Sequence, residues 1–132
     1  MLLVSIFAFN AYMNDKSIPQ PTAVVTYPAI VGQVIAHQRS ARGIKQGDLA
    51  TALGLSQSAY SRLESGDSVL NLSQLNHIAA RLVLSPARIL ELADQYQMRL
   101  LQQGVNVVPG KQDHSAAIAI GLGLLAALFI SS

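Results

Sequence analysis

Several polar side chains recur on one side of a short predicted helix, and their chemistry suits contacts to DNA. They are short or flexible groups that follow a turn signal, namely Gln57, Ser58, Ser61 and Arg62. Amide, hydroxyl and guanidinium groups bind base edges and phosphate oxygens, and the major groove admits one helix. The pattern therefore predicts a surface that contacts double-stranded DNA.

The residues around these side chains have the spacing that two tightly crossed helices require. Counted from Gln46, the fifth residue is Ala50, the ninth is Gly54 and the eighteenth is Leu63. A helix-turn-helix needs a small residue where its two backbones approach, and Ala50 is small. Gly54 can adopt the left-handed conformation of the turn without strain, and Leu63 closes the angle from the core side.

This stretch resembles a known family. The residues from Arg39 to Gly66, RSARGIKQGDLATALGLSQSAYSRLESG, are similar to the helix-turn-helix of the Cro/CI (XRE-type) phage repressors and bacterial regulators. The resemblance extends over roughly residues 30–92. It implies a lambda-repressor-like fold and binding to an operator in double-stranded DNA.

The resemblance also implies roles for individual residues. Gln46 would bind a phosphate and steady a glutamine on the next helix, while Gln57 and Ser58 would face base edges. Ser65 and Gly66 would offer backbone amides to a phosphate. Together with the expected helix cap Ser56, the predicted DNA-binding residues are Gln46, Ser56, Gln57, Ser58, Ser61, Arg62 and Ser65.

A second set of residues is predicted to hold the fold. The resemblance implies a buried salt bridge between Arg39 and Glu64, whose net contribution to stability is near zero although breaking it is costly. The predicted structural residues are Arg39, Glu64, Ala50, Gly54 and Leu63.

The loop after the recognition helix departs from the family pattern. Residues 67–70 read Asp-Ser-Val-Leu, where many relatives carry lysine or arginine, and the net charge of the chain is only +2. Fewer phosphate contacts mean weaker binding and a shallower salt dependence. We therefore expect the chain to bind DNA as a homodimer.

The central segment predicts an all-α, five-helix bundle over residues 28–103. Its helices are expected to begin at Pro28, Gln46, Ser56, Asn71 or Ser73, and Ser85-Pro86, and to end near Gly43, Gly54, Gly66, Leu82 and Leu101. Serine and asparagine cap helix starts, and glycine follows helix ends. Residues 14–27 and 104–114, which contain proline and glycine, are predicted to be linkers.

Both ends of the chain are apolar. Residues 116–130 lack charged and polar side chains, and a helix over residues 115–132 is predicted to be separate from the bundle and to cross the inner membrane. The alternative is that this tail packs on the domain or on another subunit. The apolar residues 1–13 lack the basic start of a signal peptide, so translation from Met13 is a second hypothesis.

The composition argues against catalysis and bound cofactors. The chain has no cysteine, its three histidines lie far apart in the sequence, and it has neither paired acids nor a glycine-rich phosphate loop. We expect no enzyme activity, no metal and no cofactor.

Three functions remain open from the sequence. The first is a sequence-specific, dimeric transcriptional regulator whose DNA-binding domain lies in the cytoplasm, tethered by residues 115–132. The second is a membrane-anchored helix-turn-helix module that binds protein, which the acidic loop and low net charge favour. The third is the antitoxin of a toxin–antitoxin pair.

Overall fold

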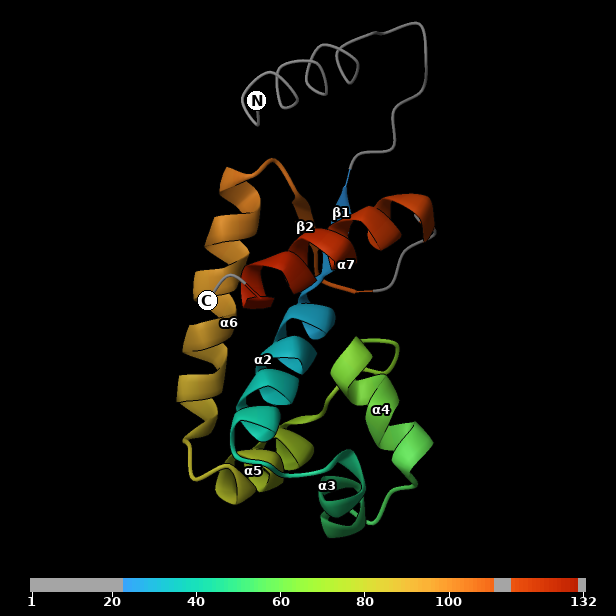
Figure 1. Cartoon of the computed structure of the whole chain (residues 1–132), viewed down its shortest axis with the longest axis vertical. Helices are drawn as coiled ribbons and strands as arrows, with labels where there is room; N and C mark the ends of the chain where they lie inside the picture. Colours follow the sequence, from blue (N-terminus) through green and yellow to red (C-terminus); the bar gives the residue numbers. More distant parts are fainter. Residues whose placement is uncertain (1–22, 111–114, 131–132) are drawn as a thin grey trace, which may run out of the picture.

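The computed structural model describes residues 23–110 and 115–130 (Figure 1). The elements follow in the order β1 (Val24–Thr26), α2 (Tyr27–Ala41), α3 (Gln46–Ala52), α4 (Gln57–Ser65), α5 (Leu72–Arg81), α6 (Pro86–Gln102), β2 (Asn106–Val108) and α7 (Ser115–Ile130). The predicted five-helix bundle with a further C-terminal helix is confirmed. Residues 1–22, 111–114 and 131–132 lie outside the described residues, and with them the predictions made for the apolar N-terminal segment.

Local capping signals set the helix boundaries. The Ser56 hydroxyl accepts a hydrogen bond from the Ala59 amide at 3.1 Å, and Asn71 forms a capping box with Gln74 at the start of α5. Helix α5 ends differently from its neighbours, because Val83 takes up a left-handed conformation with φ 57°. A β-branched side chain is strained there, and Val83 is also 88% exposed.

The core lies around α2, which packs against both α4 and α6. Apolar positions that recur at helical spacing point inward, as the sequence predicts. The largest fully buried side chains include Ile30, Val34, Ile35, Leu49, Tyr60, Ile78, Leu82, Ile89 and Leu100.

Each predicted linker contains a short strand, which the sequence does not reveal. β1 and β2 pair in parallel, with Val25 opposite Val107, and Val25 is fully buried. Thr26 then caps α2, since its hydroxyl accepts a hydrogen bond from the Ala29 amide at 3.2 Å. Three-residue strands are too short for an alternating pattern to reveal them.

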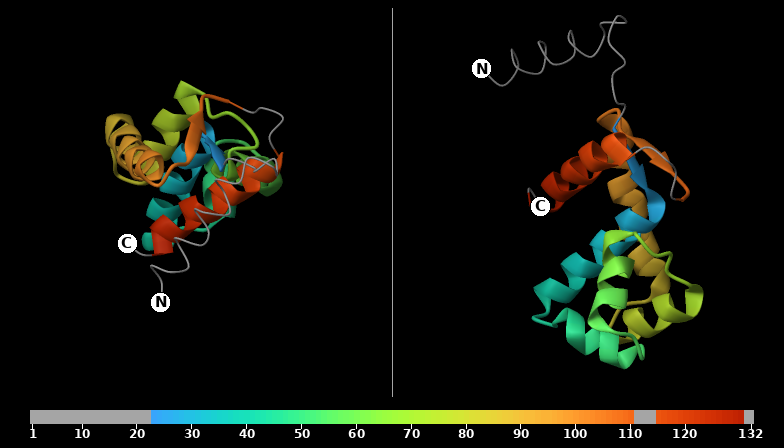
Figure 2. Two further views of the ribbon diagram at one scale, coloured as in Figure 1. Left: turned by 90° about the horizontal axis from the view of Figure 1, so that it is seen from above. Right: turned by 90° about the vertical axis from the view of Figure 1, so that its right-hand side faces the viewer.

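Helix α7 lies across β1 and against α2 and α6 (Figures 1 and 2). Leu125 is fully buried, and the Phe129 ring stacks on Tyr96 with 4.0 Å between ring centroids. A methyl group added at Gly121 would overlap the Val24 carbonyl oxygen, so the helix and the strand touch through their backbones.

The predicted transmembrane helix is not supported. Within the part of the chain that the structure describes, no helix combines the length and apolar character that crossing a membrane requires. The structure instead shows the alternative arrangement, in which the apolar tail packs on the domain.

Candidate nucleic-acid interface

The outward side of α4 carries the polar residues that the sequence assigns to DNA. Gln57, Ser58 and Arg62 are exposed and Ser61 is half-buried. The opposite side of the helix is buried through Tyr60, Leu63 and Glu64. The structure therefore gathers these four of the predicted contact residues on one face of one helix.

The turn between α3 and α4 has the geometry that its sequence predicts. Gly54 adopts a φ of 68°, and the Leu55 amide donates a hydrogen bond to the Ala50 carbonyl at 2.9 Å. Ala50 is 2% exposed, which leaves no room for a larger side chain where the two helices meet.

A close approach between α2 and α4 was not anticipated from the sequence. A Cβ atom added at Gly32 would lie 2.5 Å from the Leu63 carbonyl oxygen and 2.7 Å from the Glu64 carbonyl carbon. These are backbone atoms of α4, so they cannot move aside as a flexible side chain would. Gly32 therefore sets how closely α4 packs on α2.

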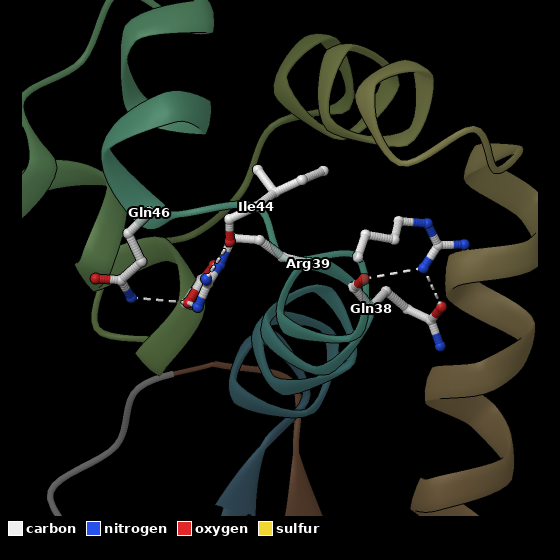
Figure 3. Close-up of polar contacts among 6 residues, drawn as sticks. Gln38, Arg39, Ile44 and Gln46 are labelled. Carbon is white, nitrogen blue, oxygen red and sulfur yellow. Dashed lines mark hydrogen bonds and ion pairs between the residues drawn. The ribbon is translucent and has the colours of Figure 1, made fainter.

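The Arg39 guanidinium and the Glu64 carboxylate form a bidentate ion pair, which joins α2 to α4. Arg39 Nε donates to Glu64 Oε1 at 2.6 Å and Arg39 Nη2 donates to Glu64 Oε2 at 3.1 Å. A third donor, Arg39 Nη1, binds the Ile44 carbonyl at 2.8 Å (Figure 3). The side chains are 15% and 5% exposed. The hydrogen bond from Arg39 to Glu64 raises the pKa of the guanidinium above its ordinary value, so the Arg39 side chain stays charged.

Gln46 extends this network to the surface. Its amide nitrogen donates to Glu64 Oε2 at 2.8 Å (Figure 3). The resemblance implied a contact between Gln46 and a glutamine on the next helix, but here the hydrogen bond goes to the buried glutamate. The Gln57 side-chain oxygen instead faces Gly47, 3.9 Å from the position of a Cβ added there. Glu64 thus orients the side chain predicted to bind a phosphate.

Tyr60 lies beside the ion pair. Burial, and then the neighbouring Glu64 carboxylate, raise the pKa of its phenol well above the ordinary value, so the hydroxyl stays protonated. Among the described residues it has no partner in hydrogen-bonding geometry. Its ring is fully buried in the core.

Ser65 and Asp67 form a pair that the sequence did not reveal. The Ser65 hydroxyl donates to the Asp67 carboxylate at 3.0 Å, and the Gly66 amide donates to the Leu63 carbonyl at 3.3 Å. The Gly66 amide, one of the two expected to bind a phosphate after α4, is thus engaged within the chain. The exposed Asp67 carboxylate adds a negative charge at the same place.

One exposed cation was missed by the sequence analysis. Lys45 is the N-cap residue of α3 and directly precedes Gln46. Lys45 could have been identified from the sequence, because it is next to Gln46, which is predicted to bind a phosphate. Arg42 is also exposed, and it donates a hydrogen bond to the side-chain oxygen of Gln38 at 2.8 Å. Its guanidinium is therefore bound to α2, one turn before the end of that helix.

Metal ligation finds no support in the described ranges, 23–110 and 115–130. No three histidine, cysteine, aspartate or glutamate side chains in them come together in an arrangement that could hold an ion. His37 packs against the Phe129 ring, with 5.3 Å between ring centroids.

Comparison with known proteins agrees with this geometry. The helix-turn-helix domain family matches residues 30–98. A structure of the clp gene regulator ClgR from Corynebacterium glutamicum is 23% identical, with a TM-score of 0.56, and the match covers 58% of this chain and 82% of that one. Another ClgR structure from C. glutamicum is 25% identical, with a TM-score of 0.50 and coverages of 52% and 90%. No curated protein matches the chain.

Proposed function

Because this chain belongs to the helix-turn-helix domain family, we propose that it is a sequence-specific transcriptional regulator acting in the cytoplasm. Helix α4 enters the major groove of an operator, and the start of α3 contacts the adjacent phosphate backbone. Two solved structures that share its fold are of a protein named as a gene regulator, which supports this proposal.

The observation that carries the proposal is the division of α4 into two faces. Leu63 and Glu64 are tied to α2, whereas Gln57, Ser58 and Arg62 face solvent. Amide and guanidinium groups on a rigid helix can make the paired hydrogen bonds that distinguish adenine and guanine. A helix held this firmly by its inner face presents them in a fixed register.

The regulator binds its operator as a homodimer. A single copy offers few cations to the phosphates, with Lys45 and Arg62 near the proposed contact face and Asp67 opposing them. Two copies on one duplex double the number of base contacts and select half-sites one helical turn apart. A palindromic target is therefore expected.

Selection from a random DNA pool tests this function. The full chain should enrich a short motif with two-fold symmetry, and competition should show at least ~10³-fold preference for it over unrelated duplex. Enrichment of no motif would contradict the assignment as a DNA reader.

Arg62→Ala is the sharpest single change on the proposed contact face. Loss of a guanidinium contact to a base should weaken binding to the selected motif by roughly 5- to 150-fold, which corresponds to about 1–3 kcal/mol. Fluorescence anisotropy with the labelled motif measures it. Arg81→Ala, which removes an exposed arginine at the end of α5, is the matched control and should leave the affinity unchanged. Equal effects of the two changes would refute the role of Arg62.

Asp67→Lys should have the opposite effect. The substitution removes a carboxylate beside the expected phosphate path and supplies an ammonium, so affinity should rise on specific and unrelated duplexes alike. The slope of log affinity against log salt should steepen by up to about 0.9. Glu91→Lys makes the same charge change on α6, where Glu91 pairs with Arg88 at 2.9 Å, and should leave the slope unaltered.

The second candidate function is a protein-binding module, which the acidic Asp67 favours because its exposed carboxylate would repel a DNA phosphate at the end of α4. The two functions differ in the Asp67→Lys experiment. A module that does not bind DNA would gain only weak, sequence-independent binding from the new cation.

A further inference from the structure

Helix α7 has two apolar sides, of which the domain covers only one. Its inner side is buried through Ala117, Gly121 and Leu125. The outer side is exposed and consists of Ala119, Ile120, Leu122, Gly123, Ala126, Ala127 and Ile130. We call these seven residues the outer face of α7. Ile120, Leu122 and Ile130 are 40%, 36% and 87% exposed, and a contiguous apolar surface of this kind marks an interaction site.

The inner side holds α7 in place, so the helix cannot simply turn its outer face inward. Gly121 touches the β1 backbone at Val24 without room for a methyl group. Phe129 stacks on Tyr96 of α6 at the other end of the helix. Rotating α7 would break both contacts, so no part of the chain that the structure describes covers the outer face.

Charge identifies the kind of partner. Residues 115–130 carry no ionisable side chain, so the outer face offers nothing to nucleic acid or to the acidic headgroups of a membrane, which basic residues recognise. A neutral apolar surface is complementary to itself under two-fold symmetry. We propose that the outer face of α7 is the surface on which a second copy of this chain docks, an inference that rests on the proposed function as a dimeric regulator.

The shape of the face fits a helix pair. Ala119, Gly123 and Ala127 follow one another at four-residue spacing, with Gly123 in the middle. Such small residues let two helices approach closely, while Ile120 and Ile130 flank the contact and exclude water. The pair would cross near Gly123, because this residue has the least side chain to separate the backbones.

The size of the face predicts a weak dimer. A 16-residue helix is about 24 Å long and about 10 Å wide, so the pair buries on the order of 500 Å² in total. Stable dimers bury roughly 1,200–2,000 Å² and smaller contacts are transient. We therefore expect a monomer–dimer equilibrium in free protein and a dimer on DNA, where the second copy is held nearby.

The position of α7 leaves the DNA contacts free. In Figures 1 and 2, α7 lies at the end of the molecule with β1 and β2, whereas α3 and the start of α4 lie at the other end. A partner on the outer face of α7 would therefore not cover Gln46 or Gln57.

Sedimentation velocity of the full chain without DNA tests the surface directly. The apparent mass should rise with concentration between about 1 and about 100 μM. Ala126→Glu places a carboxylate in the outer face and should keep the chain monomeric over that range. Ala80→Glu makes the same change at an exposed position of α5 and should dimerise like the wild type. A wild type that stays monomeric, or an Ala126→Glu variant that dimerises equally, overturns the proposal.

A cross-linking experiment locates the contact within the face. The chain has no cysteine, and an added Cβ at Gly123 meets nothing within 4 Å. Gly123→Cys should form a disulfide-linked dimer on mild oxidation, whereas Ala80→Cys should not. Equal cross-linking of both variants would show chance collision and refute the interface.

Two further measurements distinguish the dimer contact from lipid binding by the outer face and from failure of the proposed DNA-binding function. Flotation of the full chain with phosphatidylcholine–phosphatidylglycerol vesicles should leave it unbound, and a chain that floats as a monomer would assign the face to lipid and overturn the dimer. Ala126→Glu should still bind a single half-site like the wild type while losing affinity for the full palindrome. If the wild type does not bind a half-site, the proposed DNA-binding function is contradicted, and the α7 contact is not.

Discussion

Gly32→Ala is expected to lower the free energy of unfolding by roughly 2–4 kcal/mol. The same substitution inside an ordinary helix raises it by about 0.5–1 kcal/mol, because alanine loses less backbone entropy than glycine. Here the new Cβ would lie 2.5 Å from the Leu63 carbonyl oxygen. Either α2 or α4 has to shift, and the packed core between them resists the shift.

Urea denaturation of Gly32→Ala measures the loss, and Gly47→Ala is its matched control. Gly47 lies in α3, and a Cβ added there would meet only the Gln57 side-chain oxygen, at 3.9 Å. Its replacement should therefore leave stability unchanged or raise it by up to about 1 kcal/mol. If both variants gained stability, the backbone contact between α2 and α4 could not be as close as described.

Gly32 also shows where reading the sequence fails. The helix caps were predictable because Ser56, Asn71 and Ser85 each act on a backbone amide three residues away. The left-handed turn at Gly54 was predictable for the same local reason. The need for glycine at residue 32 comes from atoms of residues 63 and 64, which only the folded chain brings near.

The strands and α7 illustrate the same limit at larger scale. β1 and β2 are some 80 residues apart in the sequence, and each has three residues. Only the packing of α2–α6 in the folded chain brings the two segments together. The apolar composition of residues 116–130 suits a membrane and a protein surface equally well, and the packing at Gly121 and Phe129 distinguishes the two.

At the candidate site, residue types were predictable and their partners were not. The spacing of Gln57, Ser58 and Arg62 places them together on the outer side of α4. The partner of Gln46 depends on a side-chain conformation, since its amide can reach Glu64 or point toward solvent. The same holds for Ser65, whose hydroxyl binds Asp67.

Arg39→Ala should lower the free energy of unfolding by about 3–5 kcal/mol. The Glu64 side chain, which is 5% exposed in the intact pair, would lose its cationic partner and keep the hydrogen bond from the Gln46 amide. Chemical denaturation measures the loss. The control is Arg88→Ala, which breaks the pair with Glu91 at 46% and 60% exposure and should cost no more than about 0.5 kcal/mol.

Replacing both charges separates stability from function. In Arg39→Ala, the Glu64 carboxylate has lost its cationic partner. The double variant Arg39→Met with Glu64→Leu has no such carboxylate and fills the space with apolar atoms. It should therefore regain most of the stability that Arg39→Ala loses. The double variant also lacks Glu64 Oε2, which accepts a hydrogen bond from the Gln46 side-chain amide at 2.8 Å in the wild type. DNA affinity should therefore stay several-fold below that of the wild type, although the protein is folded. Full recovery of both properties would mean that Glu64 does not orient Gln46, and a variant as unstable as Arg39→Ala would mean that the buried charge is not the cause of the loss.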